Sequence, residues 1–535
     1  MGGGAGSILM SEHLCVTSQN TDPRGVALLR SAHDLGITAL TGIDISDLVF
    51  FRGGIHDDTK QIIESLLVDS LLQHGEWNRA STQHQHLVET ALHPGVTDST
   101  TDELQRVIRR MDLPIDGVAS GKRFALHGSL SPNELERLIS ALLANPIIER
   151  WSVDSPIEPL FVDTQAIATI AVHRVPIDAT TTPEQLAVIN KERGLALDPE
   201  ELIAIRDHFS QRGVHPTDVE LETIAQTWSE HCAHKTFRAN ITTESGSPRP
   251  SLINQLRTST DTINAPYVVS SFVGNAGIIS FTPGRTLALK CETHNHPSAI
   301  EPFGGANTGV GGVIRDIMGA QHTPIACTNI LCFGPPDTDT LSLPEGVFPP
   351  LRTRDGVIDG IADYGNKIGL PTVAGAVLYD PGYTANPLVY AGCIGTSNSF
   401  VDQVAPQPRD RIVVLGGRTG RDGLRGATFS SMTMDATTGD VSGASVQIGD
   451  PITEKLVIDV LVDAQHLYRA ITDCGAGGLS SAIGEMAEGV GANPSSQIAQ
   501  TIGNASAQPV RAYVVSQDIT SQQMLDRKSN SAAVF

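Results

Sequence analysis

The segment Thr286–Asp316, with the sequence TLALKCETHNHPSAIEPFGGANTGVGGVIRD, contains the pattern that decides the fold class of this chain. A strand-like apolar run is followed by a polar segment and then by a glycine-rich segment that leads into a helical pattern. The same alternation of short β-branched runs with helical ones continues between Gly274 and Gly489, for example at Ile412–Leu415. We therefore predict an α/β enzyme core over this part of the chain.

Four polar side chains follow the strand-like run at every second position: Lys290, Glu292, His294 and His296. The period-2 alternation of a strand predicts that all four share one face. Such a face presents a cation, a metal-seeking carboxylate and two imidazoles to one ligand. An exposed edge strand is one alternative. A zinc hydrolase that uses His294 and His296 is another, although it lacks further ligands at a suitable spacing.

Residues 303–316, FGGANTGVGGVIRD, are rich in glycine. Small residues let backbone N–H groups approach a phosphate closely, and a helix amino terminus favours the anion. We predict a phosphate-contacting loop that enters a helix, with a simple turn as the alternative. Neither GxxxxGKS nor GxxxxGKT occurs, which excludes an ordinary P-loop. Arg315 and Asp316 combine a phosphate donor with a hard-cation ligand, unless they form an exposed ion pair.

Two more glycine clusters, at residues 443–451 and 472–479, each contain one polar side chain of interest, Gln447 and Asp473 respectively. Glu292, Asp316 and Asp473 together provide enough oxygen ligands for one or two Mg²⁺ ions that bridge phosphates. For Asp473 by itself, an Asx turn is the alternative interpretation. The glycine clusters and the acidic residues therefore favour phosphate chemistry with a divalent cation.

Residues 8–152 are predicted to be two copies of one small α+β module. Phe50 recurs as Phe124 and Trp77 recurs as Trp151, each at an offset of 74 positions. In each copy a turn is followed by a helical pattern, a strand pair and a Leu-rich helix, so we predict a paired sheet. A docking or scaffold role and a duplicated fold without chemistry both stay open.

A polar connector at residues 153–240 contains three predicted helices, which begin at Thr182-Pro183, Asp198-Pro199 and Thr217-Asp218. We predict that the third runs through Trp228 and has the segment Ser229–Lys235 at its end. Residues 491–535 are rich in Ser, Gln, Asn and Ala and have no clear period. For this tail we predict disorder, or the product of a shifted reading frame.

The composition bounds the class of protein. A length of 535 residues predicts three or four domains, at roughly 100–200 residues per domain. No stretch approaches the ~20 apolar residues of a membrane helix. The formal net charge of −22 argues against nucleic-acid binding, which needs clustered Lys and Arg. The seven cysteines form no CxxC motif, so we expect a cytoplasmic location without disulfides or structural zinc.

Five segments resemble the formylglycinamide ribonucleotide amidotransferase family, also called phosphoribosylformylglycinamidine synthase: Gln226–Cys232, residues 292–316, Arg352–Gly360, Ser445–Pro451 and Asp473–Leu479. The resemblance implies repeats of the aminoimidazole ribonucleotide synthetase type, with a sheet-forming domain at 265–405 and a partial α/β domain at 410–490. The front module resembles a small accessory subunit that some relatives have as a separate chain. Because the family would continue with a second half, we expect a chain truncated after its first catalytic half.

The resemblance also implies functions for individual residues. The implied catalytic residues are His294, as proton acceptor, and His231. The implied ATP contacts are Lys290 and His234, the latter standing where short relatives have Tyr. The implied Mg²⁺ ligands are Glu292, Asp316 and Asp473. The implied substrate-binding residues are Thr293, His294, Asn295, His296, Arg315 and Gln447.

The reaction implied by the resemblance belongs to purine biosynthesis. ATP phosphorylates an amide oxygen of formylglycinamide ribonucleotide, and ammonia then displaces phosphate to leave an amidine. The ammonia is expected from glutamine through a separate glutaminase subunit, or as free ammonium. The alternatives are a different ATP-using member of the superfamily, such as a kinase or cyclo-ligase, and an inactive fragment or scaffold subunit.

Overall fold

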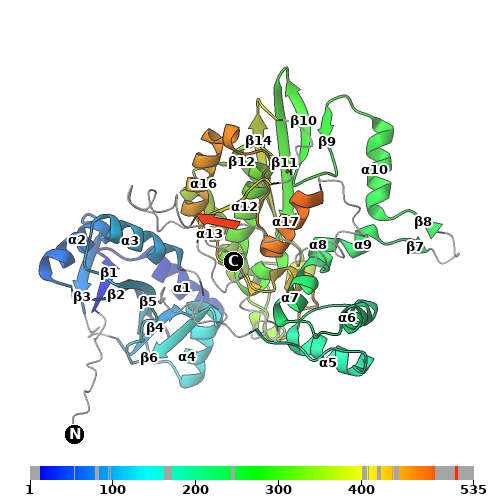
Figure 1. The fold of residues 1–535 in the computed structure, drawn as a ribbon. Coiled ribbons are helices and arrows are strands. Elements are labelled where there is room, and N and C mark those ends of the chain that lie inside the picture. Colours follow the sequence, from blue (N-terminus) through cyan, green and yellow to red (C-terminus); the bar gives the residue numbers. More distant parts are fainter. Residues whose placement is uncertain are drawn as a thin grey trace, which may run out of the picture.

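The computed structural model describes residues 12–53, 55–78, 84–93, 96, 98–146, 148–161, 172–242, 248–400, 406–407, 409–417, 423–436, 438, 445–488 and 512–515. Figure 1 shows a front sheet formed by residues 12–153, a group of short helices at 183–238, and a second sheet at 268–397 with its helices. Most of the predicted tail at 491–535 lies outside the described residues.

The front module is one six-stranded sheet with helices. Its elements are β1 (Glu12–Ser18), α1 (Pro23–Asp34), β2 (Gly42–Arg52), α2 (Asp57–Leu67), β3 (Gln73–Trp77), β4 (His86–Leu92), α3 (Ser99–Arg110), β5 (Gly117–His127), α4 (Pro132–Leu138), the π-helical turn η1 (Ile139–Leu143) and β6 (Glu149–Val153). The strands lie in the order β3-β1-β2-β5-β4-β6, and all neighbours are antiparallel.

The sequence repeat corresponds to two copies of strand–helix–strand–helix–strand that meet at the centre of the sheet. Phe50 of β2 lies opposite Ala119 of β5, and Ile45 lies opposite Phe124, as two-fold symmetry requires. The predicted paired sheet is confirmed. The Leu-rich helix predicted in the first copy is α2, and it is followed by the edge strand β3, which was not predicted. Pairing with β1 stabilises this strand, and local periodicity does not reveal such a partner.

Helices cover one face of the front sheet, and the chain that leaves the module covers part of the other. On this second face Ile157 packs against a cluster that includes Phe50. The buried Glu89 carboxylate accepts the backbone N–H of Ile157 (2.8 Å) and the Nε–H of Arg123 (2.7 Å). A buried ion pair therefore ties the connector to the sheet.

Short capped helices follow: α5 (Pro183–Arg193), α6 (Pro199–Gln211), α7 (Asp218–Thr227), α8 (Glu230–Ala233) and α9 (Lys235–Arg238). The first three begin where predicted, because Thr182, Asp198 and Thr217 each form a capping box. The third helix ends at Thr227, with Trp228 as its C-cap, within one residue of the prediction. The Ser229 hydroxyl then accepts the N–H of Cys232 (3.3 Å) and caps a new helix.

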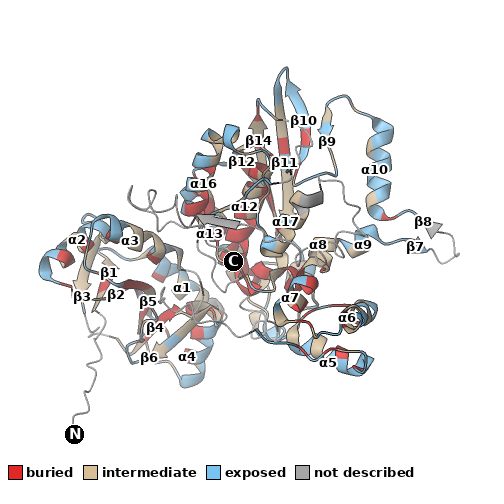
Figure 2. Cartoon of the chain, in the orientation of Figure 1, coloured by how far each residue is buried: buried red, intermediate tan, exposed pale blue. Residues whose placement is uncertain are grey.

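The second sheet contains β9 (Val268–Ser270), β10 (Gly277–Thr282), β11 (Arg285–Thr293), β12 (Thr323–Phe333), β13 (Thr372–Tyr379) and β14 (Leu388–Ser397), in the order β13-β12-β14-β11-β10-β9. β12 and β13 are parallel, and the other neighbours are antiparallel. The helices α12 (Pro302–Gly319) and α13 (Pro350–Ile368) pack together, and α12 contacts β11, β12 and β14. Figure 2 shows that α12 is the buried centre of this region.

The other described elements are β7 (Ile241–Thr242), β8 (Pro248–Arg249), α10 (Leu252–Ile263), α11 (Asn295–Ile300), η2 (Thr340–Ser342), η3 (Pro381–Tyr383), β15 (Ile412–Leu415), α14 (Gly426–Phe429), α16 (Pro451–Asp463), η5 (Gln465–Leu467), α17 (Gly478–Glu488) and β16 (Ala512–Val515). β16 falls within the predicted tail and pairs in parallel with β15. Across the ranges given above, no helix combines the length and apolar character needed to cross a membrane.

The glycine-rich segment 303–316 lies entirely inside α12, so the prediction of a phosphate-contacting loop is wrong. Its glycines allow other parts of the chain to approach closely. A Cβ added at Gly305 would lie 2.7 Å from Ser298 Cα, and one at Gly309 would lie 2.9 Å from His294 Cβ. Both distances are shorter than a normal contact, so close packing explains these glycines.

The front module docks on the second region through polar contacts. Arg106 of α3 donates to Thr453 Oγ1 in the first turn of α16 (2.6 Å) and lies 3.9 Å from the Asp450 carboxylate. At a second place Arg352 of α13 donates to the Ser140 carbonyl of η1 (3.0 Å). The first of these contacts brings the front module close to the loop that contains Gln447, one of the predicted substrate residues.

Arg106→Ala is expected to loosen this docking, because it removes a hydrogen bond and an ion pair at the first turn of α16. The loss should be about 1 kcal/mol, since the contact is only partly buried. Hydrogen exchange of the backbone amides of residues 452–455 measures the effect. Exchange there should become faster.

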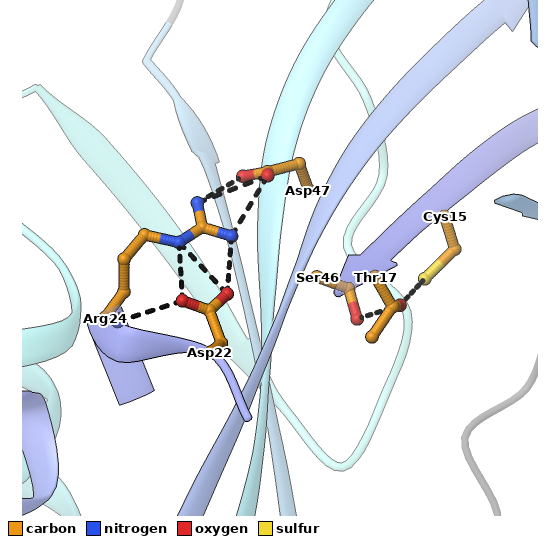
Figure 3. A network of polar contacts seen from close by, with 6 residues as sticks. All are labelled: Cys15, Thr17, Asp22, Arg24, Ser46 and Asp47. Carbon is orange, nitrogen blue, oxygen red and sulfur yellow. Dashed lines mark hydrogen bonds and ion pairs between the residues drawn. The ribbon is translucent and has the colours of Figure 1, made fainter. Parts of the chain in front are cut away.

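Arg24→Ala is the matched control. Figure 3 shows Arg24 between Asp22 and Asp47, at N–O distances of 2.8 and 3.1 Å. This cluster belongs to the first copy of the repeat, whereas Arg106 belongs to the second. The control should leave exchange in α16 unchanged. Equal exchange rates in the Arg106→Ala and unaltered proteins would contradict the docking role.

Candidate active site

Lys290 and Glu292 lie on one face of β11, as the alternation predicts, and they meet Asp316 of α12. Lys290 Nζ is 3.1 Å from Asp316 Oδ2 and 3.5 Å from Glu292 Oε2. Burial acts to lower the pKa of Lys290, but the two carboxylates outweigh it and the pKa is raised. Burial acts to raise the pKa of Glu292, but attraction from Lys290 and then from His231 outweighs it and the pKa is lowered. The ammonium group thus joins two of the predicted Mg²⁺ ligands.

Asp473 reaches the same group from the loop before α17. Asn275 Nδ2 donates to Asp473 Oδ1 (2.8 Å). Burial and then repulsion from Asp473 raise the pKa of Asp316 to about 7, while Lys290 opposes the shift. The three predicted metal ligands therefore share one electrostatic site. Within the described part of the chain, no three His, Cys, Asp or Glu side chains stand close enough to form a ready-made metal site.

His294 ends the strand and precedes α11, where its backbone N–H donates to the Val389 carbonyl (2.8 Å). Burial lowers the pKa of His294 to about 4, although Glu292 acts in the opposite direction. Its Nδ1 atom is buried and has no hydrogen-bond partner. Burial also lowers the pKa of His231 in α8. A neutral imidazole with a buried, unpaired nitrogen has the properties of a proton acceptor.

The prediction that four polar residues share one strand face is wrong at its end. β11 stops at the exposed Thr293, and Asn295 and His296 belong to α11, where strand alternation no longer applies. His296 Nε2 hydrogen-bonds the Met432 carbonyl (3.0 Å). Asn295 Oδ1 accepts the backbone N–H of Val389 in β14 (2.8 Å). Because His296 is engaged in this way, the two-histidine zinc alternative has no support among the described residues.

Arg315 of α12 contacts one residue that the sequence analysis missed, and that residue bonds to a second one. Its Nη1 atom is 3.3 Å from Glu454 Oε2 of α16. Tyr364 of α13 donates to the same oxygen. Both new residues are buried. An acidic residue in the first turn of a helix is a common feature of helix starts, so nothing in the local sequence marks Glu454.

Gln447 is held against α12, because Thr308 Oγ1 donates to its backbone carbonyl (2.6 Å). A cavity of about 3090 Å³ extends from here to α3 of the front module, and its lining includes His231, His294, Arg315, Gln447 and Asp473. Lys290 lines a second cavity of about 420 Å³ together with Asn275. His234 is exposed, has a φ of 51°, and is not in the lining of either cavity.

Three domain families match the sequence in the order of the chain. The formylglycinamide ribonucleotide amidotransferase linker domain matches residues 186–235. The N-terminal domain of AIR synthase related proteins matches residues 273–397, and the C-terminal domain matches residues 407–512. Subunit PurL of phosphoribosylformylglycinamidine synthase from Thermoplasma acidophilum is 40% identical over 308 residues, which cover 56% of this chain and 38% of the relative. These matches support the resemblance of the chain to the phosphoribosylformylglycinamidine synthase family.

Other PurL proteins are also similar to the chain. PurL of Moorella thermoacetica is 40% identical over 286 residues, which cover 52% of this chain and 35% of the relative. Thermotoga maritima PurL, solved with FGAR and with ATP, is 35% and 32% identical, with TM-scores of 0.41 and 0.38. The two matches cover 54% and 53% of this chain and 41% and 39% of the solved chains.

The comparisons support the family resemblance and the fold class predicted from the sequence. The linker, sheet-forming and α/β matches follow one another in the order predicted from the sequence. The match of the C-terminal domain extends to residue 512, inside the predicted tail. The chain spans about two fifths of the length of the curated relatives that it matches.

Proposed function

We propose that this chain provides a substrate and ATP site of an ATP-dependent C–N ligase that converts formylglycinamide ribonucleotide to formylglycinamidine ribonucleotide in purine biosynthesis. The main support is that His294, Arg315 and Asp473 all line one cavity. Beside them, Lys290 forms ion pairs with Glu292 and Asp316. A solved relative from Thermotoga maritima is described in complex with FGAR, and another with ATP. In this proposal residues 265–405 and 410–490 form the two sides of the site.

Arg315 and Gln447 would bind the substrate directly. A guanidinium group binds phosphate with two parallel hydrogen bonds, which suits the ribonucleotide phosphate. Thr293, Asn295 and His296 would contribute mainly through the turn that they form. Two of these side chains already bond to the backbone of β14 and of Met432, and they hold His294 at the end of β11.

Glu292, Asp316 and Asp473 would hold Mg²⁺ together with the nucleotide. The chemistry of the donors fits, because all three are carboxylates, and burial followed by repulsion from Asp473 raises the pKa of Asp316. Mg²⁺ commonly takes one or two carboxylates and completes its shell with water and substrate phosphates. A site completed only by nucleotide therefore agrees with the described geometry. When bound, the ion supplies charge neutralisation for phosphoryl transfer.

The proposed reaction has two steps. The amide oxygen of the substrate attacks the γ-phosphorus of ATP and ADP leaves. Ammonia then attacks the amide carbon, and phosphate leaves to give the amidine. Neutral His294 would accept the proton that the attacking nitrogen loses, with His231 as the second catalytic histidine.

The nucleotide and the ammonia have separate proposed contacts. Lys290 would bind ATP phosphate through its ammonium group, and the exposed His234 would stack on the base. The ammonia would come from glutamine through a glutaminase subunit. One solved assembly from Thermotoga maritima is described as PurLQS.

Release of ADP tests the proposed function. The chain is incubated with ATP and Mg²⁺, with and without formylglycinamide ribonucleotide and ammonium. We expect ADP release that requires both additions. Turnover with another phosphorylated acceptor would instead indicate a kinase or cyclo-ligase. Absence of nucleotide binding would indicate a scaffold or an inactive fragment.

A further inference from the structure

Tyr364 lies where three helices meet at the wall of the large cavity. It belongs to α13, which contacts both α12 and α16, and only 1% of its surface is exposed. Its hydroxyl donates to Glu454 Oε2 of α16. The same oxygen accepts a hydrogen bond from Arg315 Nη1 of α12 at 3.3 Å. One buried carboxylate oxygen thus holds a tyrosine and an arginine from two other helices.

Two glycines from different predicted motifs make room for Tyr364. A Cβ added at Gly311 of α12 would collide with the tyrosine hydroxyl. A Cβ added at Gly449, two residues after Gln447, would lie 2.7 Å from the ring atom Cε2. A side chain at either position would displace the ring and break its hydrogen bond to Glu454. Both glycines therefore serve the same contact.

The guanidinium of Arg315 forms a hydrogen bond through Nη1, whereas its Nε–H group has no partner. Nη1 bonds to Glu454, and Nε is buried. The edge formed by Nε and Nη2 is the one with which arginine binds a phosphate bidentately. A buried donor without a partner is unfavourable, and a ligand oxygen at this edge would satisfy it. Arg315 lines the large cavity, so such a ligand would lie there.

We propose that Glu454 and Tyr364 are a positioning pair, which fixes the Arg315 guanidinium with its Nε–Nη2 edge toward the phosphate of a ligand in the cavity. This rests on the proposed function, in which that ligand is the substrate. Both members also line the cavity, but in this proposal they act through Arg315. Asp473 and Asp316 also attract the guanidinium. The bond to Glu454 prevents it from turning toward these carboxylates and losing the edge that binds phosphate.

Binding of formylglycinamide ribonucleotide, measured by isothermal titration calorimetry, tests the pair. Glu454→Gln should weaken binding by about tenfold to a hundredfold, because the charged hydrogen bond to Arg315 is lost. Tyr364→Phe should weaken it by a smaller factor, since the ring still fills the space between the glycines. Asp459→Asn is the matched control on α16. Asp459 pairs with Lys455 at the surface (2.6 Å), and its substitution should leave binding unchanged.

A double-mutant cycle separates positioning from general packing. In Arg315→Met protein, adding Glu454→Gln should weaken binding no further, because the residue through which Glu454 acts is gone. Equal weakening in both backgrounds would overturn the proposal. Unchanged binding in Tyr364→Phe protein would do the same, and this variant keeps the test valid if Glu454→Gln does not fold.

Failure of the proposed function gives a different result. If the unaltered chain binds no formylglycinamide ribonucleotide, that function is contradicted, and the same variants are compared with inorganic phosphate as the probe. Weaker phosphate binding by Glu454→Gln would still support the positioning pair. Phosphate binding that is equal in all variants, or absent from the unaltered chain, would overturn it.

Discussion

His294→Ala is expected to lower substrate-dependent ADP release by about 10²- to 10⁴-fold, the range typical of a lost general acid or base. Burial lowers the pKa of His294 to about 4, so the ring is neutral at pH 7 and can accept a proton. Its Nδ1 atom has no protein partner. Calorimetry should show that binding of the substrate weakens far less than turnover, because phosphate recognition belongs to Arg315 in the proposed function.

His466→Ala is the matched control for this prediction. His466 of η5 lines the same large cavity, but it is exposed and has no place in the proposed chemistry. Its loss should leave turnover at the level of the unaltered chain. Retained turnover in a folded His294→Ala protein would remove His294 from the mechanism.

Gly305→Ala is expected to reduce the free energy of unfolding by about 1–3 kcal/mol, the usual cost of overpacking a core. The added Cβ would lie 2.6 Å from the Pro297 carbonyl carbon and 2.7 Å from Ser298 Cα. These are backbone atoms, so α11 and α12 would have to move apart. Urea denaturation followed by circular dichroism measures the loss.

Gly312→Ala, on the same helix, separates packing from helix propensity. A Cβ at Gly312 would meet nothing closer than Arg315 Nη2 at 3.9 Å. This substitution should stabilise the protein by up to about 1 kcal/mol, since alanine favours a helix over glycine. If Gly305→Ala instead kept full stability and weakened nucleotide binding, the segment would have the phosphate-contacting role predicted from its composition.

Features that depend on near neighbours in the chain could be predicted from the sequence. The starts of α5, α6 and α7 follow from capping residues whose partners lie three positions away. Lys290 and Glu292 share a face because side chains alternate along a strand. The repeat in the front module predicted its paired sheet, and motif order predicted the family.

Tertiary packing decided which of these residues lie together. Tyr364 and Glu454 are separated by 90 positions, and Arg315 and Glu454 by 139. Packing also decided that residues 303–316 are a buried helix, because the neighbours of a glycine depend on the elements folded against it. Helix capping and side-chain pairing along a helix join residues that are at most about four positions apart. Contacts between helices and pairing of strands join distant positions, so residue types were predictable while their partners were not.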